Sequence, residues 1–194
     1  MKNVLKFKII GLSIFSMFLF SSLQAQSETR VGIRGGVLFS NQDFKNGGLD
    51  INSKAKLGLD LALVADFPVG EVLNISPELH WLQKGSKIED IQGNDLTYTL
   101  NYIEVPVLLK FKFGGTDVGF SVFGGPSFGY LLDGNDNITL NDYKKIEIGL
   151  HAGAGVVLGP LVIDLRYLFG VSNISDTEVE VRNNGLGAGV SLMF

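Results

Sequence analysis

The side chains that could do chemistry here are charged residues and two histidines, set at alternate positions of otherwise apolar segments. His80 and His151 are the only histidines, and the absence of cysteine excludes disulfides, thiolate metal sites and a cysteine nucleophile. A serine activated by a histidine base remains to be considered, because Ser76, Glu78 and His80 alternate within one segment. The alternating polar set is Arg34, Asp60, Asp66, Glu78, His80, Glu104, Lys110, Lys112, Glu147, His151, Asp164 and Arg166.

The segments that carry these residues alternate between apolar and polar or glycine positions, which is the pattern of strands. A helix would scatter the leucines of 57–67 around its circumference, whereas a strand places them on one face. The apolar face is almost unbroken and the polar face is rich in glycine, which favours lipid outside and a narrow lumen inside. We therefore expect Leu61, Leu109, Leu150 and Leu165 to face lipid. Eight segments follow the pattern: 31–39, 57–67, 73–81, 103–113, 118–130, 146–156, 161–171 and 186–194.

Eight strands of this length predict an all-β fold, an eight-stranded antiparallel up-and-down transmembrane β-barrel. The connections alternate in length: 41–56, 85–96, 133–145 and 173–184 are long, and 68–71, 114–117 and 159–160 are short. Outer-membrane barrels have short periplasmic turns and longer outer loops. The sequence thus predicts a cell outer membrane protein whose N- and C-termini are periplasmic.

The N-terminus has the features of a signal peptide. Lys2, Lys6 and Lys8 precede an apolar run over 9–20, and a small residue, Ala25, offers a cleavage site. We expect residues 1–25 to be removed and residues 26–194 to form the barrel domain. Removal of three lysines enlarges the excess of 20 acidic over 16 basic residues, which argues against nucleic acid as a partner.

Several motifs resemble a known family, the PorT-like outer-membrane β-barrel proteins of the Bacteroidetes. The segment 102–110 reads YIEVPVLLK and 123–132 reads FGGPSFGYLL, and both are similar to strand signatures of that family. Later matches are GAG at 153–155, DLRY at 164–167 and GVSNI at 170–174. The terminal Phe194 resembles the aromatic residue that the outer-membrane insertion machinery reads. The resemblance implies the fold and the membrane location, and through the founding member a link to a protein-secretion system, but no single activity.

The polar face predicts a lumen filled by paired charges, because an eight-stranded barrel is just wide enough for side chains and unpaired buried ions are costly. The predicted pairs join Arg34, Lys110, Lys112 and Arg166 to Asp60, Glu78, Glu104, Glu147 and Asp164. The alternative for this set is a gated polar path or a ligand site. Phe194, at the end of the last strand, is the predicted assembly signal.

The first functional hypothesis is a non-enzymatic barrel that serves in envelope structure or assembly, or in surface interaction, through four long outer connections. The alternatives are a narrow solute channel and a membrane-embedded hydrolase. No catalytic, metal or cofactor site is predicted. Expected partners are outer-membrane lipid, the insertion machinery, and an envelope or secretion-system protein. The acidic residues of the long connections are Asp43, Asp50, Glu89, Asp90, Asp95, Asp133, Asp136, Asp142, Asp176, Glu178 and Glu180.

Overall fold

The computed structural model describes residues 29–46, 49–51, 53–89, 95–115, 117–135, 143–176 and 180–194. The predicted signal peptide, residues 1–25, lies outside this set. Among the described residues, no helix is long and apolar enough to cross a membrane. The strands are β1 (Arg30–Asn46), β2 (Leu49–Ile51), β3 (Lys54–Pro68), β4 (Leu73–Glu89), β5 (Asp95–Gly114), β6 (Val118–Gly134), β7 (Ile146–Leu158), β8 (Leu161–Gly170) and β9 (Glu180–Met193).

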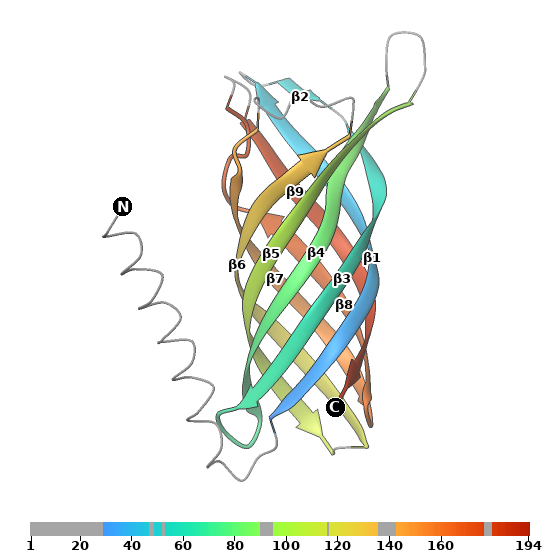
Figure 1. The fold of residues 1–194 in the computed structure, drawn as a ribbon, viewed down its shortest axis with the longest axis vertical. Helices are drawn as coiled ribbons and strands as arrows, with labels where there is room; N and C mark the ends of the chain where they lie inside the picture. Colours follow the sequence, from blue (N-terminus) through green and yellow to red (C-terminus); the bar gives the residue numbers. More distant parts are fainter. Residues whose placement is uncertain are drawn as a thin grey trace, which may run out of the picture.

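The strands form one closed antiparallel sheet (Figure 1). Each long strand pairs with the next along the chain from β3 to β9, and β1 pairs with both β3 and β9. β2 lies outside the ring and pairs only with the end of β1, from Phe44 to Asn46. The barrel proper therefore consists of eight strands, and the predicted all-β, eight-stranded antiparallel fold is confirmed.

The outer wall is apolar, as the alternation predicts. Along β3 the side chains alternate strictly between exposed and buried positions from Lys56 to Val64. Leu61, Leu109, Leu150 and Leu165 lie on the outer face with 47–60% of their surface exposed. Exposed apolar residues on every barrel strand join these four leucines in a band around the wall. Such a band is stable against lipid and unfavourable in water, which explains why the apolar residues of this chain point outward.

Several strands continue beyond their predicted ends. β1 runs to Asn46, β4 to Glu89 and β6 to Gly134, while β5 starts at Asp95 and β9 at Glu180. The prediction that 41–56, 85–96, 133–145 and 173–184 are wholly connections is therefore wrong, because ladder hydrogen bonds continue where the apolar alternation stops. Of the acidic residues assigned to these connections, Asp43, Asp50, Glu89, Asp95, Asp133 and Glu180 lie in strands, Asp176 lies in a connection, and Asp90, Asp136, Asp142 and Glu178 lie outside the described residues.

The two ends of the barrel differ. At one end, here called the turn end, short connections over 69–72, 115–117 and 159–160 join the strands, and the C-terminus lies there (Figure 1). Gly159 has a φ of +59°, a left-handed conformation that suits glycine in so tight a turn. The opposite end, here called the loop end, carries the extended strands. The alternating long and short connections thus place all short turns at one end.

The interior changes character along the barrel. Towards the loop end, several inward side chains are apolar and pack into one buried cluster, beside buried polar residues such as Gln42 and Lys84. On β4, for example, Leu82 follows Glu78 and His80 on the inward face. This apolar cluster consists of Leu38, Leu82, Leu100, Tyr102, Leu131, Leu168, Ile174 and Val181.

Candidate functional site

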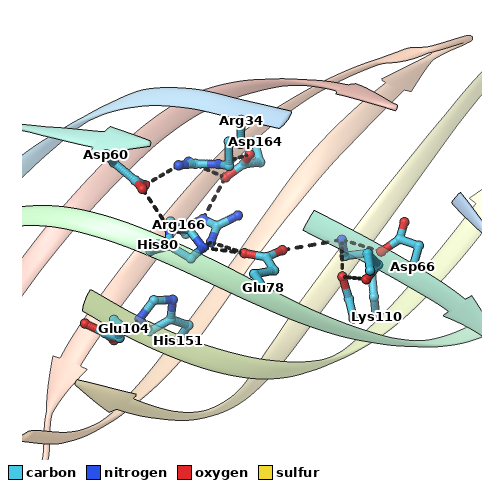
Figure 2. Close-up of polar contacts among 12 residues, drawn as sticks. Arg34, Asp60, Asp66, Glu78, His80, Glu104, Lys110, His151, Asp164 and Arg166 are labelled. Carbon is cyan, nitrogen blue, oxygen red and sulfur yellow. Dashed lines mark hydrogen bonds and ion pairs between the residues drawn. The ribbon is translucent and has the colours of Figure 1, made fainter. Parts of the chain in front are cut away.

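The centre of the lumen holds a network of buried ion pairs that starts at Arg34 on β1 (Figure 2). Arg34 binds Asp164 of β8 with two hydrogen bonds of 2.9 Å, donated by Nε to Oδ2 and by Nη2 to Oδ1. Its Nη1 also donates to Asp60 of β3. A planar guanidinium that faces one carboxylate with two donors is the strong form of this pair. Arg34 thus joins two carboxylates from opposite sides of its own strand.

A glycine on β9 makes room for this guanidinium. Gly189 lies between β1 and β8 in the sheet, and a Cβ atom there would overlap the Arg34 side chain. The absence of a side chain therefore lets Arg34 reach across β9 to Asp164. This gives a physical reason for the glycine-rich inward face that the sequence displays.

Arg166 and His80 extend the network across the lumen. Arg166 donates from Nε to Asp164 Oδ1 at 2.9 Å and from Nη1 to Glu78 Oε2 at 2.8 Å. His80 contacts Asp60 through Nδ1 at 2.6 Å and Glu78 through Nε2 at 2.7 Å. A neutral imidazole has one N–H, so both contacts are hydrogen bonds only when the ring is an imidazolium. His80 then acts as a cation between two carboxylates.

A second group lies towards the turn end. Lys110 donates to Asp66 Oδ1 at 3.0 Å, and Lys112 donates to Asp66 Oδ2 at 2.7 Å. Lys110 also lies 3.8 Å from Glu78, which connects this group to the central network. Lys112 is the most exposed member of the group, with 28% of its side chain accessible.

A third group lies towards the loop end, and its cation was missed by the sequence analysis. Lys84 lies 2.5 Å from Glu104 and 3.2 Å from Glu147. His151 contacts Glu104 at 2.6 Å, and Asn183 donates to Glu147 at 3.1 Å. The predicted partners of Glu104 and Glu147 were other cations, so this part of the pairing scheme is wrong. Lys84 could have been predicted from the alternation, because it lies an even number of residues after Glu78 and His80 and so shares their inward face. It was missed because the predicted strand stopped at residue 81.

These groups and the apolar cluster leave little free space inside the barrel. A cavity of about 20 Å³ lies between the central and turn-end groups, lined by residues that include Asp66, Glu78 and Lys110. This is about the room that one water molecule needs. All nine predicted lumen residues point inward: Arg34, Asp60, Glu78, Glu104, Lys110, Lys112, Glu147, Asp164 and Arg166.

The serine and the histidine considered for hydrolysis do not bind each other. The Ser76 hydroxyl donates to the Ala65 carbonyl at 2.8 Å and accepts from Lys110 at 3.2 Å. His80 has both ring nitrogens on carboxylates, so neither nitrogen is placed to accept a proton from Ser76. Within the described part of the chain, no group of three or more histidine, aspartate or glutamate side chains could hold a metal ion.

The comparisons with known proteins agree with this geometry. The family model described as "Outer membrane protein beta-barrel domain" matches residues 24–176, well over half of the chain. The chain belongs to this family. The apolar wall is accordingly the face that meets the lipid of an outer membrane. No curated protein matches the sequence.

Solved outer-membrane barrels share the fold at low sequence identity. The outer membrane protein OprG from Pseudomonas aeruginosa is 13% identical, with a TM-score of 0.54 over 88% of this chain and 98% of its own. Neisserial surface protein A is also 13% identical, with a TM-score of 0.51 over 87% of this chain and 98% of its own. These similarities support the fold of an outer-membrane barrel, and they assign no activity to this chain.

The C-terminal residue of this outer-membrane barrel lies where the sheet closes. The Phe194 N–H donates to the Val31 carbonyl at 2.7 Å, and the Phe194 carbonyl accepts from the Val31 N–H at 3.2 Å. Its side chain is 69% exposed on the outer wall at the turn end. An open edge in lipid would leave backbone groups unpaired, so the last residue contributes directly to closure.

We predict that Phe194 directs assembly. Deletion of Phe194, or Phe194→Asp, should lower the amount of heat-modifiable, protease-resistant barrel in the outer membrane, because the aromatic girdle and the closing pair are weakened. The conservative variant Phe194→Tyr should keep the wild-type yield. Phe194→Asp keeps the backbone pair with Val31, so its assembled molecules should unfold like the wild type. An unchanged yield after deletion would show that the terminal residue is not a sorting signal.

Proposed function

We propose that the protein is a non-enzymatic outer-membrane barrel that acts through the surface of its loop end, in envelope assembly or in binding another molecule. The observation that carries the proposal is the filled lumen. Ion pairs occupy its centre, an apolar cluster lies towards the loop end, and the cavity between the described side chains has room for about one water. A barrel whose interior is filled offers only its outer surface for function.

The loop end supplies such a surface. The β4–β5 ladder continues to the pair Glu89 and Asp95, and β1 and β9 remain paired as far as Lys45 and Glu180. These hydrogen-bonded extensions form a firmer platform than isolated loops, and exposed acidic side chains stand on them or beside them, as at Asp43, Asp133 and Asp176. A polar rim whose exposed acidic residues stand beside basic ones such as Lys144 and Lys145 suits a charged or polar partner.

We further propose that the protein is PorT-like and comes from the Bacteroidetes, on the motifs at 102–110 and 123–132. On this proposal, residues 1–25 are a cleaved signal peptide and both termini of the mature chain are periplasmic, so the loop end faces outward. The partners are then the insertion machinery, which reads Phe194, and an envelope or secretion-system protein. The short turns at the end that carries the C-terminus support this orientation.

Planar-bilayer recording tests the plugged lumen. The purified monomer should give no large, stable conductance, because ion flow requires the central ion pairs to separate and the apolar cluster to open. A wide porin inserted into the same bilayer shows that recording conditions are sound. Large, stable steps from the monomer would contradict the proposal and favour the solute channel.

A lipid-turnover assay tests the alternative that the protein is a membrane-embedded hydrolase. Wild-type protein and Ser76→Ala should release fatty acid from phospholipid vesicles equally slowly, at the background rate. Turnover that disappears in Ser76→Ala would contradict the non-enzymatic assignment and identify a membrane-embedded hydrolase.

A further inference from the structure

One lysine of the inner face differs from the other cations there. Lys56 of β3 is only 7% exposed and lies opposite Ser40 of β1. None of the carboxylates that the structure describes lies within ion-pair distance of Lys56. Because a buried charge without a counter-charge is costly, Lys56 is a position that would gain from an anion. The other inward cations each have at least one carboxylate partner: Arg34, Lys84, Lys110, Lys112 and Arg166.

A second lysine lies close to Lys56 at the loop ends of β3 and β4. Lys87 of β4 is partly exposed, and its charge repels that of Lys56. Among the described side chains, Lys87 also has no carboxylate within ion-pair distance. The strand register places Lys54 directly opposite Lys87, and like charges in such positions repel each other. Lys54, Lys56 and Lys87 together are here called the lysine patch.

The level of the lysine patch in the membrane indicates which anions can reach it. Phe39 and Leu57 lie opposite each other and are each more than half exposed, and they mark the edge of the apolar band on β1 and β3. Lys56 is the next residue beyond this edge. Lys54 lies three residues from Leu57, which at about 3.3 Å per residue and a tilt of about 40° is about 8 Å along the membrane normal. The patch therefore lies at the level of lipid headgroups.

We propose that the lysine patch binds a phosphate monoester carried by a lipid of the leaflet around the loop end. The ammonium groups of Lys56 and Lys87 donate charge-assisted hydrogen bonds to the phosphate oxygens. A phosphate monoester carries about 1.5 to 2 negative charges near pH 7, so it compensates both lysines at once, whereas a carboxylate or a phosphate diester compensates one. The inference rests on the proposed outward orientation of the loop end, and it adds the class of molecule that this end binds.

Native mass spectrometry of the barrel in non-ionic detergent tests this assignment. The probes are diphosphoryl lipid A, whose phosphates are monoesters, the same glycolipid after removal of its phosphates, and inorganic phosphate. Wild-type protein should retain the phosphorylated glycolipid in preference to the dephosphorylated form. Lys56→Met and Lys87→Gln should each weaken this retention by about tenfold, the loss expected when a phosphate loses a charged hydrogen-bond donor.

Urea unfolding of the lipid-free barrel separates binding from a structural role. Lys56 has no described counter-charge to leave behind, so Lys56→Met should keep the urea midpoint of the wild type or raise it. A lowered midpoint together with unchanged lipid retention would show that Lys56 is a structural residue and would overturn the proposal. Heat-modified mobility verifies that every variant is folded.

Lys145 provides the matched control for Lys87. It is an exposed lysine directly before β7, at the same end of the barrel, and β7 lies three strands from β4 in the sheet. Lys145→Gln should leave lipid retention unchanged, because it removes the same charge away from the lysine patch. Equal retention of both glycolipid forms by wild-type protein, or equal losses in Lys87→Gln and Lys145→Gln, would overturn the proposal.

Competition with inorganic phosphate distinguishes the source of the phosphate. At equal concentration, inorganic phosphate should not displace the phosphorylated glycolipid, because the acyl chains also contact the apolar wall. Displacement would overturn the lipid assignment in favour of a free anion. The conductance test of the filled lumen does not involve these lysines, so failure of this inference and failure of the proposed function are distinguishable.

Discussion

Lys84→Met should destabilise the barrel by about 3–5 kcal/mol, the range for removing one partner of a buried ion pair. Lys84 is the only cation within ion-pair distance of Glu147 among the described side chains, and Glu147 is otherwise bound by the neutral amide of Asn183. The variant therefore leaves a buried carboxylate without a counter-charge. Urea unfolding of the refolded barrel, followed through Trp81, the single tryptophan, measures the change in the free energy of unfolding.

Two further variants separate charge from packing. Lys84→Met combined with Glu147→Gln removes both charges and should be more stable than Lys84→Met alone, because the uncompensated carboxylate is gone. Lys112→Met is the matched control at the turn end, where the lysine is partly exposed and Asp66 keeps Lys110. It should cost about 1 kcal/mol or less, as for exposed pairs. Equal losses in Lys84→Met and Lys112→Met would contradict the sealed interior.

Leu165→Arg should destabilise the barrel in phospholipid vesicles by about 2–4 kcal/mol, the value for an arginine near the membrane midplane. Leu165 lies midway along β8 and is 60% exposed on the outer wall. Its cross-strand neighbours are Ala154 and Ala188, which are too small to shield a guanidinium from lipid. Equilibrium unfolding of vesicle-inserted protein gives the difference in free energy from the wild type.

Asp176→Arg is the control for this substitution. Asp176 is exposed in the connection that follows β8, where water or headgroups surround it, so the change should lie within about 0.5 kcal/mol. If Leu165→Arg behaved like this control, the band around Leu165 would not be in contact with the hydrocarbon core.

The membrane-spanning part of the fold was predictable because lipid imposes one rule on every strand. Leu61, Leu109 and Leu165 point outward as expected, since an apolar residue at such a position gains from lipid while its neighbours fill a narrow polar lumen. The predicted lumen residues share the opposite parity for the same reason. The alternation predicts which charged side chains point inward. Their specific partners depend on the pairing register between strands, which cannot be read from the alternation within one strand.

Towards the loop end the inward face mixes apolar with charged side chains, a mixture that the alternation did not predict. Leu82 and Leu100 point inward, and Lys84 shares the same inward face, so the apolar alternation is interrupted along continuous strands. Because the apolar alternation stops at these positions, the pattern predicts a loop where the strand in fact continues. The buried Ile174 was likewise missed, because it reaches the apolar cluster from a connection and belongs to no alternating series.

The shortest of the eight barrel strands sets a limit on the membrane that this barrel fits. β8 crosses the apolar band with 10 residues, Leu161–Gly170, between a tight turn and the connection that leads to β9. At about 3.3 Å per residue and a tilt of about 40°, those residues span about 25 Å. A bilayer with a thicker hydrocarbon core must thin around the barrel, at a cost that rises with each ångström of mismatch. The acyl-chain length of the lipids therefore affects where the protein is stable. An outer membrane with a thin hydrocarbon core matches the barrel, and a membrane with a thicker core disfavours it.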